Sequence, residues 1–121
     1  MIRVNLTGSA RTKKVRITVK GHAQTAAKGA DLVCAGASMV TMMIAQHIQD
    51  LNLVPEFFKK TPNVMVASGD ALVECVCESD EKYRLLLHDL IVLTRGFYLL
   101  EHNYNGRVKV AGKGDFAVPE T

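Results

Sequence analysis

The sequence predicts an α+β fold, a two-layer sandwich in which two helices cover one mostly antiparallel sheet. Three observations predict it. Stretches with the two-residue period of strands come in pairs, each pair is followed by one long segment with helical apolar spacing, and glycines separate the paired strands. The expected order of elements is β-β-α-β-β-α-β. A chain of 121 residues is long enough for one hydrophobic core. We therefore expect one domain at residues 1–112 and a loose tail at residues 113–121.

The first strand pair lies at the N-terminus. Apolar Ile2, Val4 and Leu6 alternate with polar residues, and the same alternation recurs over residues 15–20. Residues 7–12 between the two stretches contain a glycine and a serine, which indicates a turn. The two stretches are therefore expected to form a hairpin.

A loop and then the first helix follow. Residues 21–30 are small, bounded by glycines and without a clear period, which predicts a mobile loop. Asp31 is a suitable N-cap for a helix over residues 32–53. The strongly apolar part, residues 32–45, would span only roughly 21 Å as a helix, against a hydrocarbon core of about 30 Å. We therefore expect a buried helix and no membrane partner.

The second strand pair and the second helix complete the pattern. Residues 64–67 and 72–77 have strand composition and are joined by the compact turn signal Ser68-Gly69-Asp70. Residues 80–101 carry leucines and a phenylalanine at helical spacing. A short last strand is expected at residues 108–111.

Composition excludes several classes of protein. With 48% hydrophobic and 22% charged residues, the chain is globular rather than disordered. Its net charge of +3 is too small to predict a nucleic-acid partner. The three cysteines are an odd number, and no apolar segment typical of a signal peptide follows the N-terminus. We therefore expect a cytoplasmic location with reduced thiols.

Cys34 is the candidate nucleophile. With Asp31 as the N-cap, Cys34 would occupy the third helical position, where unpaired backbone N–H groups and the helix dipole favour the thiolate form. The same N–H groups are suited to stabilise an oxyanion on a bound carbonyl. His22, on the loop upstream, is the candidate general base and acid, because a cysteine and a histidine within hydrogen-bond reach form an activated nucleophile.

Each candidate also has a structural interpretation. Cys34 on an apolar helix is often only a small buried side chain, and a loop histidine such as His22 is often only solvated. Asp31 is either a cap or a third member that orients the histidine. Ser38, one turn after the thiol, either bonds within its helix or supports the site. Gly36 indicates a close approach, either by a neighbouring element or by a substrate.

The remaining cysteines and histidines are interpreted as structural. Cys75 and Cys77 point to one face of a strand, where core packing is favoured over metal binding. The chain lacks the Cys-x₂-Cys and His-x₃-His spacings of zinc sites, so no metal and no cofactor are expected. His47, His88 and His102 have no carboxylate or thiol neighbour at a catalytic spacing and are interpreted as structural or exposed.

One motif resembles a known family. Gly21-His22-Ala23, six residues, then Gly29-Ala30-Asp31-Leu32-Val33-Cys34-Ala35, with Ser38 after it, resemble the signature of the ribosomal-processing cysteine protease family, Prp. The order of hairpins and helices resembles the family's order as well. The family often has alanine where this chain has Gly36, and a β-branched residue where it has Ala37.

The resemblance implies residue roles, a reaction and partners. It assigns the catalytic cysteine to Cys34 and the histidine to His22, supporting roles to Asp31 and Ser38, and a substrate loop to Gly21, Ala23 and Gly29. It implies a homodimeric cysteine endopeptidase that removes the N-terminal extension of a large-subunit ribosomal protein. Its partner would be a peptide or protein substrate, with no nucleic acid required.

Two other functions compete with a protease. A ribosome-associated binding module without catalysis would have a buried, unreactive Cys34. A redox-sensing thiol protein would need Cys75 or Cys77 within disulfide distance of Cys34. The endopeptidase is the leading hypothesis, with its extended substrate bound in part by pairing with a sheet edge.

Overall fold

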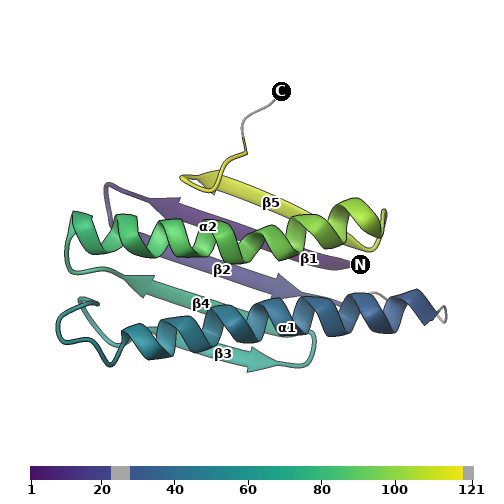
Figure 1. The fold of residues 1–121 in the computed structure, drawn as a ribbon, viewed down its shortest axis with the longest axis horizontal. Helices are drawn as coiled ribbons and strands as arrows, with labels where there is room; N and C mark the ends of the chain where they lie inside the picture. The colour runs from purple at the N-terminus through teal and green to yellow at the C-terminus, as the bar shows by residue number, and fades with distance from the viewer. Residues whose placement is uncertain (23–27, 119–121) are drawn as a thin grey trace.

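The chain folds as the predicted α+β sandwich (Figure 1). The computed structural model describes residues 1–22 and 28–118. The predicted order is confirmed, with these elements: β1 (Ile2–Ser9), β2 (Lys14–Lys20), α1 (Lys28–Leu51), β3 (Asn63–Ala67), β4 (Asp70–Val76), α2 (Asp80–Asn103) and β5 (Val108–Gly114).

The five strands form one sheet in the order β3-β4-β2-β1-β5. Three of its four strand pairs are antiparallel, and only β1 and β5 run parallel. Both helices cover the same face, α1 over β3 and β4 and α2 over β2 and β1 (Figure 1). Strands β3 and β5 are therefore the two edges, and the second face of the sheet is left without a covering layer by the described residues.

The core lies between the sheet and the helices, because the alternating strand residues point one apolar side toward them. The inward residues of β1 are Ile2, Val4 and Leu6, with relative exposures of 3%, 1% and 1%. The helices contribute buried residues at three- and four-residue spacing: Val33, Ala37, Ile44 and Ile48 from α1, and Tyr83, Leu86, Leu90 and Phe97 from α2.

The start of the first helix differs from the prediction. Helix α1 begins at Lys28, not at Leu32, so Asp31 lies inside its first turn and is not its N-cap. The physical reason is that a carboxylate interacts favourably with the helix dipole anywhere in the first turn, so an acidic residue does not fix the start. Of the predicted mobile loop, residues 23–27 lie outside the described residues, and residues 28–30 are helical.

The chain after residue 112 is held to the sheet further than expected. Strand β5 continues to Gly114, and the backbone N–H of Asp115 donates to the carbonyl of Gly8 at 2.9 Å. The Tyr83 hydroxyl donates to the Asp115 carboxylate at 2.7 Å, and Phe116 is buried. The prediction of a loose tail from residue 113 is therefore wrong for residues 113–116, because an aromatic side chain and a buried hydroxyl both find partners there. Residues 119–121 of the predicted tail lie outside the described residues.

Helix α1 has enough length and apolarity over Leu32–Leu51 to span a membrane. Here, however, its residues Val33, Ile44 and Ile48 pack against the sheet with almost no exposure. A helix that packs one face on a protein core meets the same criterion, so the buried face of α1 is consistent with both observations.

Candidate active site

His22, Cys34 and Ser38 line one open pocket of about 320 Å³. The pocket lies where the end of β2, the flank of α1 and the turn between β3 and β4 meet. Cys34 and Ser38 are four residues apart on α1, so they face the same side of the helix. The structure thus brings together three predicted site residues that come from two elements, and Gly21 lines the pocket with them.

The position of His22 is fixed by two glycines. Gly21 has a φ of +97°, and a side chain there would collide with the carbonyl oxygen of Met1, so only glycine fits. The N–H of Gly21 donates to the carbonyl of Gly69 at 2.9 Å. Gly69 has a φ of +71°, and a methyl group on it would occupy the place of the His22 ring. The turn between β3 and β4 is therefore one wall of the histidine's site.

Cys34 differs from the other two cysteines in its surroundings. Its side chain is half-buried and lines the pocket, whereas Cys75 and Cys77 are 3% and 0% exposed. Burial raises the pKa of Cys75 to about 12 and that of Cys77 to about 11, so both stay neutral thiols near pH 7. The prediction that these two residues belong to the core is confirmed, and Cys34 is the accessible thiol of the three.

Cys34 does not lie at the start of the helix, where it was predicted. Cys34 is the seventh residue of α1 and lies in its second turn, because the helix begins at Lys28. The unpaired N–H groups belong to the first turn, one turn before the thiol. The predicted third-position setting for the thiolate and for the oxyanion is therefore wrong. Among the described residues, no hydrogen bond joins His22 to Cys34; they share the pocket.

Four further predicted or singled-out residues differ in how the structure describes them. Gly29 and Asp31 lie in the first turn of α1, where the structure describes the backbone alone. Ala23 lies outside the described residues. Gly36 faces away from the pocket toward α2, where a methyl group on it would lie 3.1 Å from Leu100. The close approach indicated by this glycine is thus between helices and not with a substrate.

The pocket walls include residues that sequence reasoning did not single out. Its apolar side is formed by Ile2, Val19, Ala37, Met42 and Val66. Ala37 is the position where the resemblance implied a bulkier residue, so its small side chain widens the pocket next to Cys34. The motif gives no signal for these contacts, because they depend on which strand lies beside which.

Asp70 is the carboxylate among the described lining residues. It lies at the end of β4 opposite Lys20, and their charged groups are 3.9 Å apart. Both side chains are more than half exposed, so this ion pair is weak.

The second cavity is larger and adjoins the first. It has a volume of about 680 Å³ and lies along the outer part of α1. Met42 and Val66 line both cavities. The two cavities therefore meet beside Met42 and Val66, between α1 and β3.

The other histidines have no place in the pocket. His47 was interpreted as structural or exposed because no carboxylate lies at a catalytic spacing in the sequence, and its Nε2 lies 2.8 Å from the Asp89 carboxylate. The pair joins α1 to α2 across 42 residues of sequence, which spacing alone does not reveal. His88 and His102 are exposed. The described residues contain no group of three potential metal ligands.

Comparison with known proteins identifies the family of the chain. The sequence profile of the family described as cysteine protease Prp matches residues 1–109. No curated protein sequence matches the chain. Two crystal structures of an essential ribosomal processing protease Prp from S. aureus are similar to it, each covering 93% of this chain and 100% of that chain.

The two S. aureus structures hold different peptides. The one with a covalently linked product peptide is 26% identical with a TM-score of 0.64. The one with a substrate peptide is 25% identical with a TM-score of 0.65. A structure from Streptococcus mutans, 20% identical with a TM-score of 0.58 and covering 93% of each chain, supports the fold alone.

Proposed function

The chain belongs to the Prp family of cysteine proteases, and we propose that it is an endopeptidase that removes the N-terminal extension of a large-subunit ribosomal protein. Cys34 is its nucleophile, and His22 is its general base and acid. The observation that carries the assignment is the single pocket that both side chains line. The S. aureus relative, a ribosomal processing protease with a peptide in its structure, supports a peptide as the substrate.

In the proposed reaction both side chains act in two steps, the formation of a thioester and its hydrolysis. His22 accepts the proton of the Cys34 thiol, and the thiolate attacks the carbonyl carbon of the scissile peptide bond. The bond from carbon to nitrogen then breaks, and the imidazolium gives its proton to the leaving amine. A water molecule, deprotonated by His22, hydrolyses the thioester and restores the thiol. Hydrogen bonds between the pair are often formed only with substrate, so their shared pocket is the relevant geometry.

Ser38 is proposed to support the oxyanion. Its exposed hydroxyl lies one helical turn after Cys34 and lines the same pocket. A hydroxyl donor near the attacked carbonyl can supply part of the stabilisation that the helix start does not supply at Cys34. Asp31 lies in the first turn of α1 and is proposed to act only on the helix dipole.

The substrate is proposed to lie extended along the free edge of β3. One edge of this strand pairs with β4, and the other has no strand beside it. An extended peptide can add itself to such an edge through main-chain hydrogen bonds. It would leave the catalytic pocket between Met42 and Val66, which line both cavities. Methionine is flexible and accepts apolar side chains of different shapes, so this passage favours apolar substrate residues.

A homodimer is proposed on the outer side of the helix layer. Large apolar residues are exposed there: Leu32 (63%) and Met39 (56%) of α1, and Leu85 (57%), Val92 (60%) and Leu99 (61%) of α2. The three residues of α2 are seven positions apart and form one line along the helix. A two-fold dimer would cover this patch with the same patch of a second copy. Light scattering of the wild type and of Val92→Glu tests it: a dimer converted to a monomer is expected.

Cleavage of a synthetic peptide tests the function. The peptide spans the N-terminal extension of the ribosomal protein from the same organism, and mass spectrometry identifies the products. Wild type should cut once, while Cys34→Ala and His22→Ala should not cut. Cys75→Ser is the control for loss of a thiol that only packs, and it should retain the cut. An uncut peptide with wild type, together with a Cys34 that resists iodoacetamide, would instead favour a non-catalytic binding module.

A further inference from the structure

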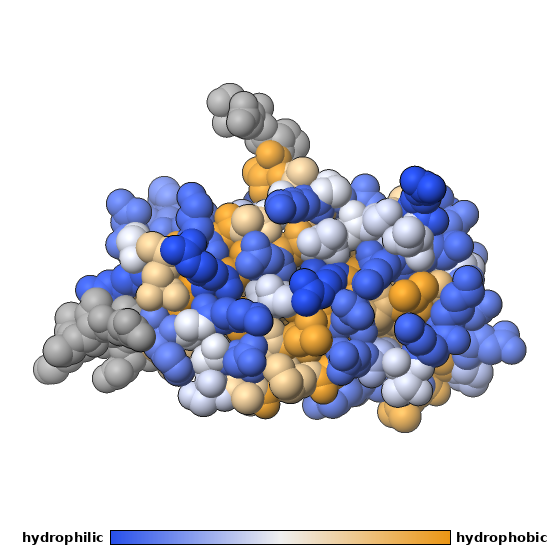
Figure 2. Space-filling view, turned by 180° about the vertical axis from the view of Figure 1, so that it is seen from behind, coloured by the Kyte–Doolittle hydropathy of each residue, from blue (hydrophilic) through white to orange (hydrophobic). Residues whose placement is uncertain are grey.

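The uncovered face of the sheet is strongly basic. Both helices lie on the other face, and Figure 2 views the molecule from behind, where hydrophilic residues predominate. The outward positions of the strands carry six cations and two carboxylates, a surplus of four, while the whole chain has a net charge of +3. We call this surface the basic face: Arg3, Lys14, Arg16, Lys20, Lys109 and Lys113, with Asp70 and Glu74.

The cations of the basic face stand next to one another across the strands. Arg3 of β1 pairs with Lys20 of β2 on one side and with Lys109 of β5 on the other. Neighbouring strands are about 4.8 Å apart, and like charges directly opposite each other destabilise a sheet. Among the described residues, neither Arg3 nor Lys109 has a carboxylate partner. The repulsion between these like charges lowers the stability of the free protein, and an anion bound to them would reduce it.

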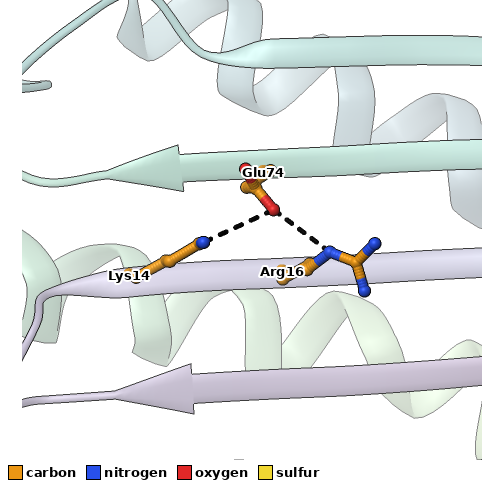
Figure 3. Close-up of polar contacts among 3 residues, drawn as sticks. All are labelled: Lys14, Arg16 and Glu74. Carbon is orange, nitrogen blue, oxygen red and sulfur yellow. Dashed lines mark hydrogen bonds and ion pairs between the residues drawn. The ribbon is translucent and has the colours of Figure 1, made fainter.

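The two carboxylates neutralise only one side of the face. Glu74 accepts from Arg16 at 3.1 Å and lies 3.6 Å from Lys14, so one carboxylate serves two cations (Figure 3). Asp70 lies 3.9 Å from Lys20. Both acids are on β4. The surplus is therefore concentrated toward the β5 edge, at Arg3, Lys109 and Lys113.

We propose that the basic face binds the phosphate backbone of RNA. Uncompensated cations in adjacent rows match a dense row of phosphates, the main source of nucleic-acid affinity. Exposed Asn5 and Thr7 lie between the rows and supply neutral donors of the kind that also contact phosphate and sugar. The outward positions of β1, β2 and β5, all within the described residues, hold no aromatic side chain. Binding is therefore expected to follow the backbone without base stacking or sequence preference.

The residues around these cations favour a nucleic acid over a membrane surface. Surfaces that bind membranes combine cations with large apolar side chains that enter the bilayer. On this face the large apolar side chains, Met65, Leu72 and Val76, lie on β3 and β4, whereas the outward positions of β1, β2 and β5, where the surplus of cations lies, carry none. The choice of RNA over DNA rests on the proposed function, because the ribosome is built on RNA. The catalytic pocket lies on the helix side of the sheet near β3, and Arg3, Lys109 and Lys113 do not line it. Bound RNA would therefore leave the pocket open to a peptide.

A pair of triple variants with equal net charge tests the proposal. Arg3→Gln/Lys109→Gln/Lys113→Gln removes three cations from the basic face. Lys60→Gln/Arg84→Gln/Arg95→Gln removes three exposed cations from elsewhere. Fluorescence anisotropy measures binding of the whole chain to a 20-base-pair RNA duplex over a range of KCl concentrations. The same peptide cleavage assay is run on each variant, so that a failure of the proposed function is seen separately.

We expect the basic-face variant to bind RNA at least about 10-fold more weakly and to reduce the slope of log Kd against log [KCl] by about 2–3, since each lost phosphate contact lowers it by about 1. The control variant should keep the wild-type slope, and both variants should keep wild-type cleavage. Equal loss in the two variants would mean that only net charge matters and would overturn the proposal. It would also be overturned by wild type that does not bind the duplex at 50 mM KCl, or that binds poly-glutamate or anionic vesicles as tightly as RNA.

Discussion

Replacing Gly69 by alanine should separate the catalytic position of His22 from the stability of the fold. The residue has a φ of +71°, a conformation that costs a side chain about 1–2 kcal/mol. The new methyl group would also overlap Nε2 and Cε1 of His22. Because the ring is packed on this glycine, it must move by about the size of a methyl group. A displacement of about 1 Å in a catalytic group can reduce kcat/KM on the order of 100-fold.

Gly106 provides a matched control for this experiment. Its φ of +82° imposes the same backbone penalty on alanine, but no atom lies within 4 Å of the added methyl group. Gly106→Ala should therefore lower the free energy of unfolding by about 1–2 kcal/mol and leave cleavage unchanged. In a domain of this size each kcal/mol corresponds to roughly 4 °C in Tm, so both variants should melt several degrees below wild type.

Thermal stability and cleavage rate together distinguish a displaced His22 from a general loss of fold stability. Differential scanning calorimetry gives the Tm values, and initial rates of peptide cleavage give kcat/KM. The expected result is a similar loss of Tm in both variants and a loss of activity in Gly69→Ala alone. If Gly69→Ala cleaves as fast as Gly106→Ala, the turn between β3 and β4 does not hold the histidine, and the catalytic conformation of His22 lies elsewhere.

Three further predictions follow from the buried thiols and the basic face. Iodoacetamide at pH 8 should label one thiol, Cys34, in the folded chain and three in guanidinium; a second fast label by mass spectrometry would contradict the burial of Cys75 and Cys77. Their pKa values of about 12 and 11 lie above the ordinary 9.0, so the folded chain keeps protons that the unfolded chain loses. Urea denaturation should therefore show full stability below about pH 9 and falling stability between about pH 9 and 11. Arg3→Thr should stabilise by about 0.2–1 kcal/mol by removing like-charge contacts, whereas Lys113→Thr, which faces a threonine, should stabilise less; equal gains in Tm would refute the repulsion.

Periodicity was sufficient to predict the fold, because each strand buries one side. The alternation in β1 and β2 and the leucine spacing in α2 both correspond to buried residues in the core. The end of β5 was not predictable in this way. Its last residues are small or charged, and they are held by a long-range hydrogen bond from Tyr83 and by burial of Phe116.

The candidate site, like the fold, was predictable from the sequence only in part. Cys34 and His22, which the motif singled out, line a common pocket, because only a short connection separates them in the sequence. The motif misplaced the helix start, since Asp31 fits the interior of a first turn as well as a cap. It also gave no information about Gly69 or Val66, which reach the pocket only because β4 pairs with β2 and β3 pairs with β4.

The register of β4 against β2 therefore sets part of the geometry of the pocket. Lys20 pairs with Asp70, so the residue before Asp70 meets the segment after Lys20, and Gly69 comes to lie beside His22. A slip of one residue would turn Ala71 and Val73 out of the core and onto the basic face, which the burial of their side chains forbids. The buried face of the sheet thus holds the histidine in place without any direct bond to it. It follows that core substitutions in β4 that loosen this register should reduce cleavage before they unfold the chain.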